Sequence, residues 1–308
     1  MKKYSNLIIV ISTFIIFIVI IMNKTIVSKT IINSFYIWFN TLLPSMLPMF
    51  IISDILISYN FTKYIPKKIT NFISKIFNIS NNATLVILLS LISGFPLNAM
   101  NIKTSYDNGF ITKDEAEHLL LFNHFPNPLF VLNTVGLLYL NNNKYGIIIL
   151  ISTILSNIII GIIFRKRNNL TNINCISKNS KSQTFTEIFS NSIKKSINSL
   201  LMTSVTICLF LILSTLIINI FNLNSYLSLV TKAVLEMTMA LEQIPSMNIS
   251  DICKVIISST IISFGGLSIH MQVISILDEK IRYRNYFIGR IYQIIISSVI
   301  SVILIYVI

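Results

Sequence analysis

The apolar run from residue 252 to residue 277 is interrupted near its middle by two adjacent glycines, Gly265 and Gly266, with polar side chains directly after them. Glycine weakens a helix interior, and a broken helix at membrane depth is tolerated only where it faces protein or a water-filled cavity. Transporters build substrate sites from such interrupted helices. The run therefore predicts a membrane helix that is broken at a binding site.

The composition of the chain is that of an integral membrane protein. It is 54% hydrophobic and only 11% charged, whereas soluble domains carry about 25% charged residues. Several apolar runs approach the roughly 20 residues that cross a bilayer. The net charge of +13 comes from basic residues between these runs, as the positive-inside rule expects of cytoplasmic loops. We therefore expect an all-α polytopic protein whose partner is the lipid bilayer and not nucleic acid.

A second interruption, Ser93-Gly94-Phe95-Pro96, lies 170 residues before the first. Together the two predict a pair of inverted repeats, each with a broken or re-entrant helix, and six full spans with two re-entrant elements in all. The expected divisions are an N-terminal anchor helix at 1–29, a first membrane repeat at 30–164, a basic cytoplasmic linker at 165–198 and a second membrane repeat at 199–308.

The chain has no pattern typical of an enzyme. A phosphate-binding glycine loop, a His-Glu-x-x-His motif and paired carboxylates within membrane reach are all missing from the sequence. His124 and His270 fall in different halves with no third ligand evident, and the three cysteines have neither paired nor metal-ligand spacing. We expect no catalytic residues, no metal and no cofactor.

Polar groups at membrane depth are the stronger candidates for a site. A carboxylate at the bilayer centre costs at least about 2.5 kcal/mol on insertion scales. The position of Glu236 in an apolar segment therefore indicates a functional role. Alternatively, residues 226–244 lie at the surface and Glu236 and Glu242 are solvated. Half-helix N-termini at the two breaks favour an anion. Alternatively, these residues are packing glycines, a proline kink and helix caps. The substrate-binding candidates are Gly94, Phe95, Pro96, Asn98, Asn123, Glu236, Gly265, Gly266, Ser268, His270 and Gln272, with His124 and Asn127 beside them.

Three local features carry simpler expectations. Thr112 followed by Glu115 fits a capping box and gives that acid a structural role. Residues 63–78 have apolar side chains at helical spacing between lysines, which predicts a helix on the membrane surface. Asp54 is either functional or placed at the interface, and the sequence leaves both interpretations open.

Several motifs in order resemble the YlbJ-type sporulation integral membrane proteins, a group with nucleoside-recognition ("Gate") domains. They are Ser93-Gly94-Phe95-Pro96, Gly109-Phe110-Ile111 with Glu115-Ala116-Glu117-His118-Leu119-Leu120, Pro128-Leu129-Phe130 with Thr134-Val135-Gly136, and Ser263-Phe264-Gly265-Gly266-Leu267-Ser268 with Gln272. Leu235-Glu236-Met237-Thr238 also looks like the family's Glu-x-Thr, which adds Thr238 to the candidate site. The segment 123–127 departs from the family's small-residue pattern.

The resemblance implies a spore-forming bacterium, a place in the outer forespore membrane, and movement of dipicolinic acid, a small aromatic dianion, out of the mother cell. Two alternatives stay open at this point. One is a permease for nucleosides or other small metabolites, although the Gln-Thr-Glu-Ala-Pro motif of nucleoside transporters is missing from the sequence. The other is a non-transporting scaffold that recruits cortex-assembly proteins through residues 165–198. A homo-oligomer is compatible with each of these.

Overall fold

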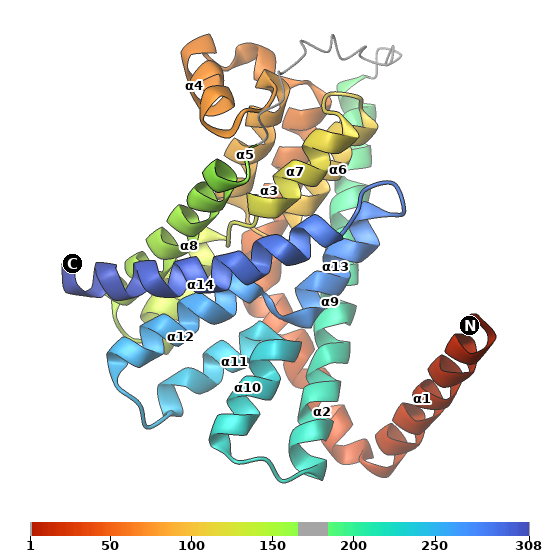
Figure 1. Cartoon of the computed structure of the whole chain (residues 1–308). Coiled ribbons are helices and arrows are strands. Elements are labelled where there is room, and N and C mark those ends of the chain that lie inside the picture. The colour runs from red at the N-terminus through yellow and green to blue at the C-terminus, as the bar shows by residue number, and fades with distance from the viewer. Residues whose placement is uncertain (1, 166–183, 308) are drawn as a thin grey trace.

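The computed structural model describes residues 2–165 and 184–307, and these residues form helices and no strand. The helices are α1 (Lys2–Met22), α2 (Lys24–Ile37), α3 (Leu43–Ser58), α4 (Lys67–Phe77), α5 (Asn81–Ser93), α6 (Leu97–Asp107), α7 (Lys113–Phe122), α8 (Asn143–Ile163), α9 (Phe185–Ile220), α10 (Ser225–Leu235), α11 (Met237–Gln243), α12 (Asp251–Phe264), α13 (Gly266–Leu277) and α14 (Arg284–Val307). A wider helical segment, Phe130–Tyr139, precedes α8. The prediction of an all-α membrane protein is confirmed (Figure 1).

Four helical segments are each long and apolar enough to cross a bilayer: α8, α9, α12 with α13 as one unit, and α14. Two further pairs meet the same requirement only together and are bent, by 95° between α1 and α2 and by 91° between α4 and α5. The described residues therefore provide four spans, or up to six if each bent pair is one span. The sequence predicted six full spans and two re-entrant elements.

Each interruption of a helix has a local cause in the sequence. Gly94 ends α5 with a φ of +77°, a left-handed value that suits glycine, and Pro96 precedes α6. Gly265 ends α12 in the same way, with a φ of +84°. Between α10 and α11 the chain is instead extended at Glu236, whose φ is −148° and ψ is 117°. This last break has neither glycine nor proline, and the sequence did not predict it.

The same order of elements occurs in both halves. A helical hairpin, α5 packed on α6, is followed by a broken segment at 113–139 and by α8; likewise α10 packed on α11 is followed by α12–α13 and α14. By this order the hairpin turn at 94–96 corresponds to Glu236, and the break at 123–128 corresponds to Gly265–Gly266. The sequence paired 93–96 with 265–266 because only those two breaks carry glycine. The inverted relation of the two halves stays a prediction.

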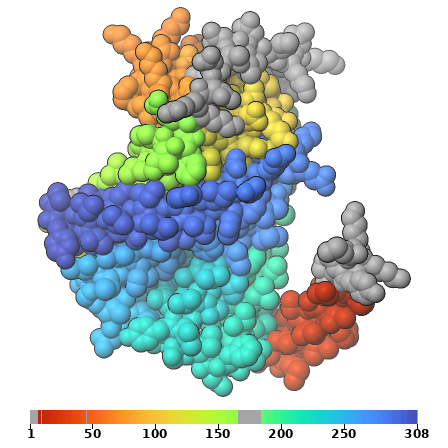
Figure 2. Space-filling model, viewed as in Figure 1, coloured from red at the N-terminus to blue at the C-terminus, as the bar shows by residue number. Residues whose placement is uncertain are grey.

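Helix α14 lies across one face of the molecule, against α12, α8 and α7 (Figures 1 and 2). Its approach to α7 is close: a Cβ built on Gly289 would lie 1.9 Å from the carbonyl oxygen of Leu121. A second close approach joins Gly136 and Gly146, where a Cβ on the first would lie 2.7 Å from the Cα of the second. Small residues allow backbones to pack at this range in membrane proteins.

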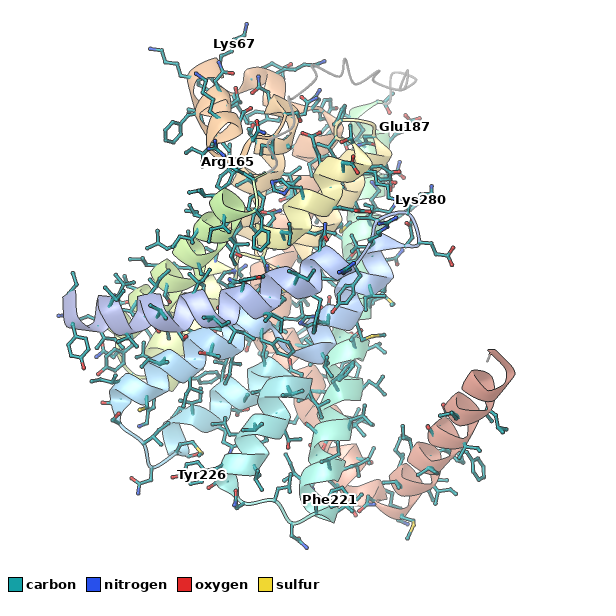
Figure 3. The ribbon with its side chains drawn as sticks, in the orientation of Figure 1. Lys67, Arg165, Glu187, Phe221, Tyr226 and Lys280 are labelled. Carbon is teal, nitrogen blue, oxygen red and sulfur yellow. The ribbon has the colours of Figure 1, made fainter. Side chains whose placement is uncertain are left out.

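Charged side chains gather at one end of the molecule. Lys67, Arg165, Lys280 and Glu187 lie at this end, whereas Phe221 and Tyr226 lie at the opposite one (Figure 3). Helix α4 is part of the charged end, and its apolar Ile69 and Phe72 are exposed, as a helix whose apolar face lies on the membrane surface requires. The common placement of basic segments agrees with the arrangement expected from the positive-inside rule.

The ends of the predicted anchor and linker differ from the helix boundaries. Helix α1 ends at Met22, inside the segment 1–29, and projects away from the remaining helices (Figure 1). Much of the segment 165–198 lies outside the described residues, but from Phe185 onward it is part of α9, which begins with a capping box formed by Thr184 and Glu187. The predicted capping box of Thr112 and Glu115 is also present, at the start of α7.

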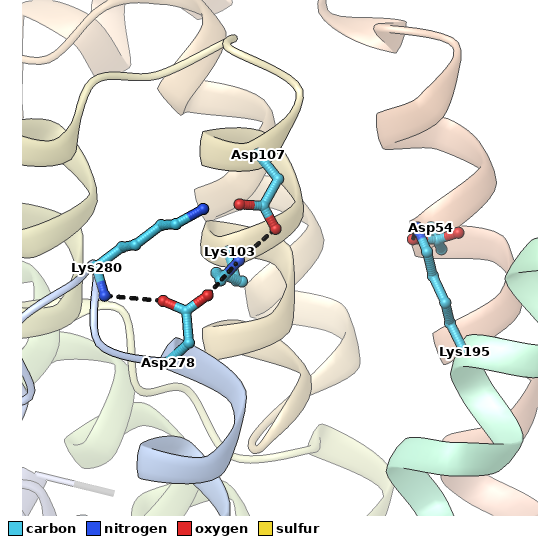
Figure 4. Close-up of polar contacts among 6 residues, drawn as sticks. All are labelled: Asp54, Lys103, Asp107, Lys195, Asp278 and Lys280. Atoms are coloured by element: carbon cyan, nitrogen blue, oxygen red, sulfur yellow. Dashed lines mark hydrogen bonds and ion pairs between the residues drawn. The ribbon is translucent and has the colours of Figure 1, made fainter.

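Asp54 is buried within the protein and paired. Only 3% of its side chain is exposed. The hydroxyl of Ser192 donates to it at 2.6 Å, and the ammonium of Lys195 lies 3.2 Å from its other oxygen (Figure 4). Both partners are on α9, so the carboxylate joins α3 to α9. Both interpretations of Asp54, a functional residue and a residue at the membrane interface, stay predictions.

Candidate functional site

In each half the turn of the helical hairpin packs directly on the break in the segment that follows it. The turns are at 94–96 and 236, and the breaks are at 123–128 and 265–266. A Cβ built on Gly94 would lie 2.3 Å from the backbone nitrogen of Asn127, so the α5–α6 turn touches the segment after α7. A Cβ on Gly266 would lie 3.3 Å from the Cα of Glu236, so the start of α13 touches the α10–α11 turn. Glycine at both positions permits these approaches. The four interruptions, at 94–96, 123–128, 236 and 265–266, therefore belong to one region of the protein, the cluster of breaks.

His124 joins the two halves of this region. A Cβ on Gly265 would lie 3.4 Å from its Nε2. Its ring stacks on Phe95 of the first hairpin turn, with 4.3 Å between centroids, and its Nδ1 is 3.0 Å from the hydroxyl of Tyr286 on α14. The side chain is fully buried, and Nε2 has no hydrogen-bond partner among the described residues. The sequence predicts His124 as a possible hydrogen-bonding residue of the site, and the structure places it at the junction of the two halves.

The asparagines of the first half hold the hairpin against the break. The amide of Asn98 donates to the carbonyl of Phe125 at 2.9 Å, and that of Asn123 donates to the hydroxyl of Ser90 at 2.8 Å. Asn127 accepts two backbone N–H bonds at the start of the next helical segment. These bonds give all three residues a structural role. The Oδ1 atoms of Asn98 and Asn123 nevertheless have no partner in the described part of the chain.

Glu236 is buried, with 1% of its surface exposed, and its carboxylate begins α11. The backbone N–H of Thr238 donates to it at 2.8 Å and that of Met239 at 3.2 Å, and the Thr238 hydroxyl donates to the same oxygen. The positive end of a helix favours such a charge. Glu236 is therefore a buried N-cap inside the candidate site, and the alternative of a solvated surface acid is wrong.

His270 sits within a cluster of aromatic rings on the other side of the break. Its Nε2 is 3.1 Å from the carbonyl oxygen of Phe264, and its Nδ1 shares a hydrogen bond with the hydroxyl of Tyr283. The Tyr286 ring lies 5.2 Å away, edge to face. Both ring nitrogens of His270 are thus engaged within the protein. The residue supports the walls of the site and has no free atom for a ligand in this conformation.

Arg290 on α14 is the principal residue that sequence reasoning missed. It is fully buried, and no ion pair of the described residues includes it. Its Nη2 donates to the carbonyl of Leu121 at 3.0 Å, its other terminal nitrogen donates to Gln293, and its guanidinium lies over the Tyr286 ring at 5.1 Å. The available signal was an arginine inside the apolar run of α14, where an ionisable residue predicts function.

Ser268 and Gln272, two further predicted residues, lie along α13. Ser268 is fully buried, and its hydroxyl has no partner within residues 2–165 and 184–307. Gln272 is 3% exposed, and neither atom of its amide has a partner in the described part of the chain. Gln272 lines a cavity of about 300 Å³ between α6, α9 and α13. It therefore lies beside the cluster of breaks and not within it.

Among the residues that the structure describes, no three His, Cys, Asp or Glu side chains gather as metal ligands. The chemical groups that meet at the breaks are one arginine, two histidines, amides, hydroxyls and the capped carboxylate of Glu236. Helices α6 and α13 both begin here without a side-chain cap. Backbone N–H groups, a guanidinium and hydroxyls bind and orient an anion; the arrangement suits recognition of a small polar molecule.

Comparison with known proteins links this arrangement to a family. A model of the nucleoside-recognition ("Gate") family matches residues 39–167. The sporulation integral membrane protein YlbJ of Bacillus subtilis (strain 168) is 25% identical over 300 residues, which cover 85% of this chain and 73% of that protein. No solved structure matches the chain. Residues 39–167 are thus similar to the nucleoside-recognition family, and the chain is similar over most of its length to a sporulation integral membrane protein.

Proposed function

We propose that this chain is a transporter that moves dipicolinate from the mother cell across the outer forespore membrane during sporulation. The observation that carries the proposal is Arg290, a buried cation that has no carboxylate partner among the described residues and lies where the broken helices meet. A transporter needs no catalytic group, and the proposal assigns none.

A buried charge is costly unless an opposite charge or several hydrogen bonds offset it. The carbonyl of Leu121 and the ring of Tyr286 supply part of this compensation. The remainder is available to an anionic substrate, whose carboxylate would pair with the guanidinium. A planar guanidinium matches a carboxylate in a two-point hydrogen bond. On this reasoning Arg290 selects anions.

The uncapped N-termini of α6 and α13 provide a second set of donors. Neither helix start has a side-chain cap, and both ends face the cluster of breaks. In α6 the N–H groups of Asn98 and Ala99 donate to the backbone carbonyls of Gly94 and Pro96, so the start of α13 is the better provided with donors for a ligand. A molecule with two carboxylates on one ring can use Arg290 with one group and a helix end with the other. Glu236 already occupies the N-terminus of α11. It would keep that turn in place and act as a gate beside Gly266.

The sporulation context comes from the comparison with the Bacillus subtilis relative, whose description is that of a sporulation integral membrane protein. The direction of movement and the outer forespore membrane follow from the resemblance seen in the sequence and belong to the proposal. The apolar helices place the chain in a bilayer.

Uptake of labelled dipicolinate into vesicles that contain the purified protein tests the proposal. Arg290→Gln removes one charge-assisted hydrogen bond, worth about 1.5–3 kcal/mol, and uptake at low substrate should fall roughly 10- to 150-fold. Arg284→Gln, an exposed arginine on the same helix, is the matched control and should retain uptake. Equal uptake by the two variants would remove Arg290 from the site.

Glu236 has its own matched pair. Glu236→Gln changes a buried cap, whereas Glu242→Gln changes an exposed acid on the same short helix. We expect the first variant to lose most uptake and the second to keep it. Spores of a strain with Glu236→Gln should also be poor in dipicolinate. Normal spore dipicolinate together with normal uptake would contradict the assignment of Glu236.

A nucleoside is the second candidate substrate, because the matching family model is described as nucleoside recognition. One structural observation favours it: the buried Oδ1 atoms of Asn98 and Asn123 have no donor in the described part of the chain. A nucleobase would supply N–H donors to such acceptors. Two uptake measurements decide between them: if the anion is the substrate, labelled dipicolinate should enter and unlabelled uridine should leave its uptake unchanged, whereas if the nucleoside is the substrate, labelled uridine should enter and labelled dipicolinate should not.

A further inference from the structure

The cavity between α6, α9 and α13 lies outside the cluster of breaks and has its own polar lining. Its volume is about 300 Å³. Methionine side chains and polar groups both line it, among them Met100, Lys103, Ser199, Met202, Gln272 and Ser275. A cavity of this size suits a molecule with one small ring.

The two half-helices that start at the breaks form two walls of this cavity. Lys103 is six residues after the start of α6 at Leu97, and Gln272 is six residues after the start of α13 at Gly266. At about 1.5 Å per residue, both side chains lie roughly 9 Å along their helices from the breaks. The cavity therefore runs beside the candidate site and on the side of the charged loops.

Gln272 indicates that this cavity is built for a ligand. Its side chain is buried, it lines the cavity, and both atoms of its amide lack a partner among the described residues. Buried amides are almost always hydrogen-bonded, because an unmade bond costs about 1–3 kcal/mol. An amide in the wall of a cavity, with neither its donor nor its acceptor engaged, can turn toward a polar molecule inside the cavity and bind it.

Lys103 supplies the charge that defines the ligand. Its ammonium is 3.1 Å from a carboxylate oxygen of Asp278 and also pairs with Asp107 (Figure 4). Burial lowers the pKa of Lys103, but its hydrogen bonds to Asp107 and Asp278 outweigh this effect and raise the pKa above the usual 10.5. The lysine is thus charged at neutral pH. Its side chain is 15% exposed, whereas both carboxylates are nearly half exposed.

We propose that this cavity is a vestibule site for a small carboxylate anion, which takes the place of Asp278 at Lys103 and receives the amide N–H of Gln272. The proposal rests on the proposed transport function and adds a first binding position on the route to the breaks. Asp278 follows α13 directly, so its release frees the connection between α13 and α14. Asp107 and Asp278 stay near the bound anion, which keeps the site weak and allows the ligand to move on.

Protection of a cysteine placed in the cavity tests the vestibule directly. Ser275→Cys is introduced into the full chain after Cys175→Ala, Cys208→Ala and Cys253→Ala, and its rate of reaction with a maleimide is measured in vesicles. Saturating dipicolinate should slow this reaction at least tenfold. Ser190→Cys, exposed on α9 and outside the cavity, is the control and should react at the same rate with and without dipicolinate. Adding Lys103→Met or Gln272→Leu should abolish protection.

The outcomes separate this inference from the proposed function. Dipicolinate uptake without protection of Ser275→Cys would overturn the vestibule and leave the transport function standing. Protection by dipicolinate that Lys103→Met removes would support the vestibule even if the vesicles show no uptake. Protection by uridine and not by dipicolinate would overturn the assignment of a carboxylate ligand. Protection that persists in both Lys103→Met and Gln272→Leu would overturn the roles of these residues.

Discussion

The close approach of α14 to α7 makes Gly289→Ala a sharp test of how the site is held together. The added Cβ would lie 1.9 Å from the carbonyl oxygen of Leu121, whereas ordinary contact begins near 3.4 Å. The obstacle is backbone at the end of α7 and has no rotamer to change. Helix α14 must therefore move back by about 1.5 Å, the difference between these two distances.

This displacement acts directly on the neighbouring residue. Arg290 donates to the same carbonyl at 3.0 Å, and a shift of about 1.5 Å takes the pair beyond hydrogen-bond range. Overpacking costs about 1–3 kcal/mol, and loss of a hydrogen bond to a charged group about 1.5–3 kcal/mol. Alanine has a higher helix propensity than glycine, which stabilises the folded state by up to about 1 kcal/mol. The expected net loss of stability is about 2–5 kcal/mol.

Thermal unfolding of the purified protein in detergent measures this loss, with an expected fall in Tm of about 5–15 °C. Gly161→Ala on α8 is the matched control, because the atoms that its Cβ would meet, at 2.6 Å and beyond, belong to the side chains of Phe77 and Phe122 and not to backbone. It gains the same helix propensity. An unfolding temperature for Gly289→Ala equal to or above that of Gly161→Ala would refute the argument from close packing.

Two other predictions concern ion pairs at the charged end. Lys195→Met should cost about 3 kcal/mol because it leaves the buried Asp54 without its cation, and adding Asp54→Asn should recover most of this loss in the same unfolding assay; no recovery would contradict the pairing. Burial lowers the pKa of Lys103, but its hydrogen bonds to Asp107 and Asp278 raise this pKa by more. The contribution of Lys103 to the free energy of unfolding is therefore complete below pH 10.5 and is lost only as the pH rises past the raised pKa. The backbone N–H of Lys280 and the nearby ammonium of Lys103 lower the pKa of Asp278. The contribution of Asp278 to the free energy of unfolding is therefore present above pH 3.8 and is lost only as the pH falls past the lowered pKa. The difference in unfolding temperature between the wild type and Lys103→Met should therefore stay constant from about pH 5 to pH 9, and a difference that varies within this range would contradict the assignment.

The features that the sequence predicted well are those with local causes. The capping box of Thr112 and Glu115 depends on four consecutive residues and is present. The amphipathic α4 follows from the spacing of its apolar side chains. The breaks at Gly94 and Gly265 follow from left-handed φ values that glycine adopts without strain. None of these requires knowledge of the rest of the fold.

The arrangement of the breaks depends on contacts between distant segments, and the sequence could not supply it. Glu236 ends α10 through an extended backbone and a side-chain cap, so no glycine or proline marks the turn. Because the break at Glu236 is not visible in the sequence, the sequence alone pairs the break at Gly94 with the break at Gly265. Packing instead places Gly94 against Asn127 and Gly266 against Glu236. Asn98, one of the predicted ligands, also joins these elements through its hydrogen bond to the carbonyl of Phe125.

Arg290 shows why a residue's surroundings matter more than its place in a motif. In the sequence it stands near the start of the last apolar run, where an arginine can extend its charge to the membrane surface. In the structure Gly289 brings α14 so close to α7 that Arg290 is enclosed between Leu121 and Tyr286. The small residue and the buried charge are consecutive for a physical reason: only the close approach removes the guanidinium from solvent. A cation held in this way increases the affinity of the site for an anion, because competing water is excluded.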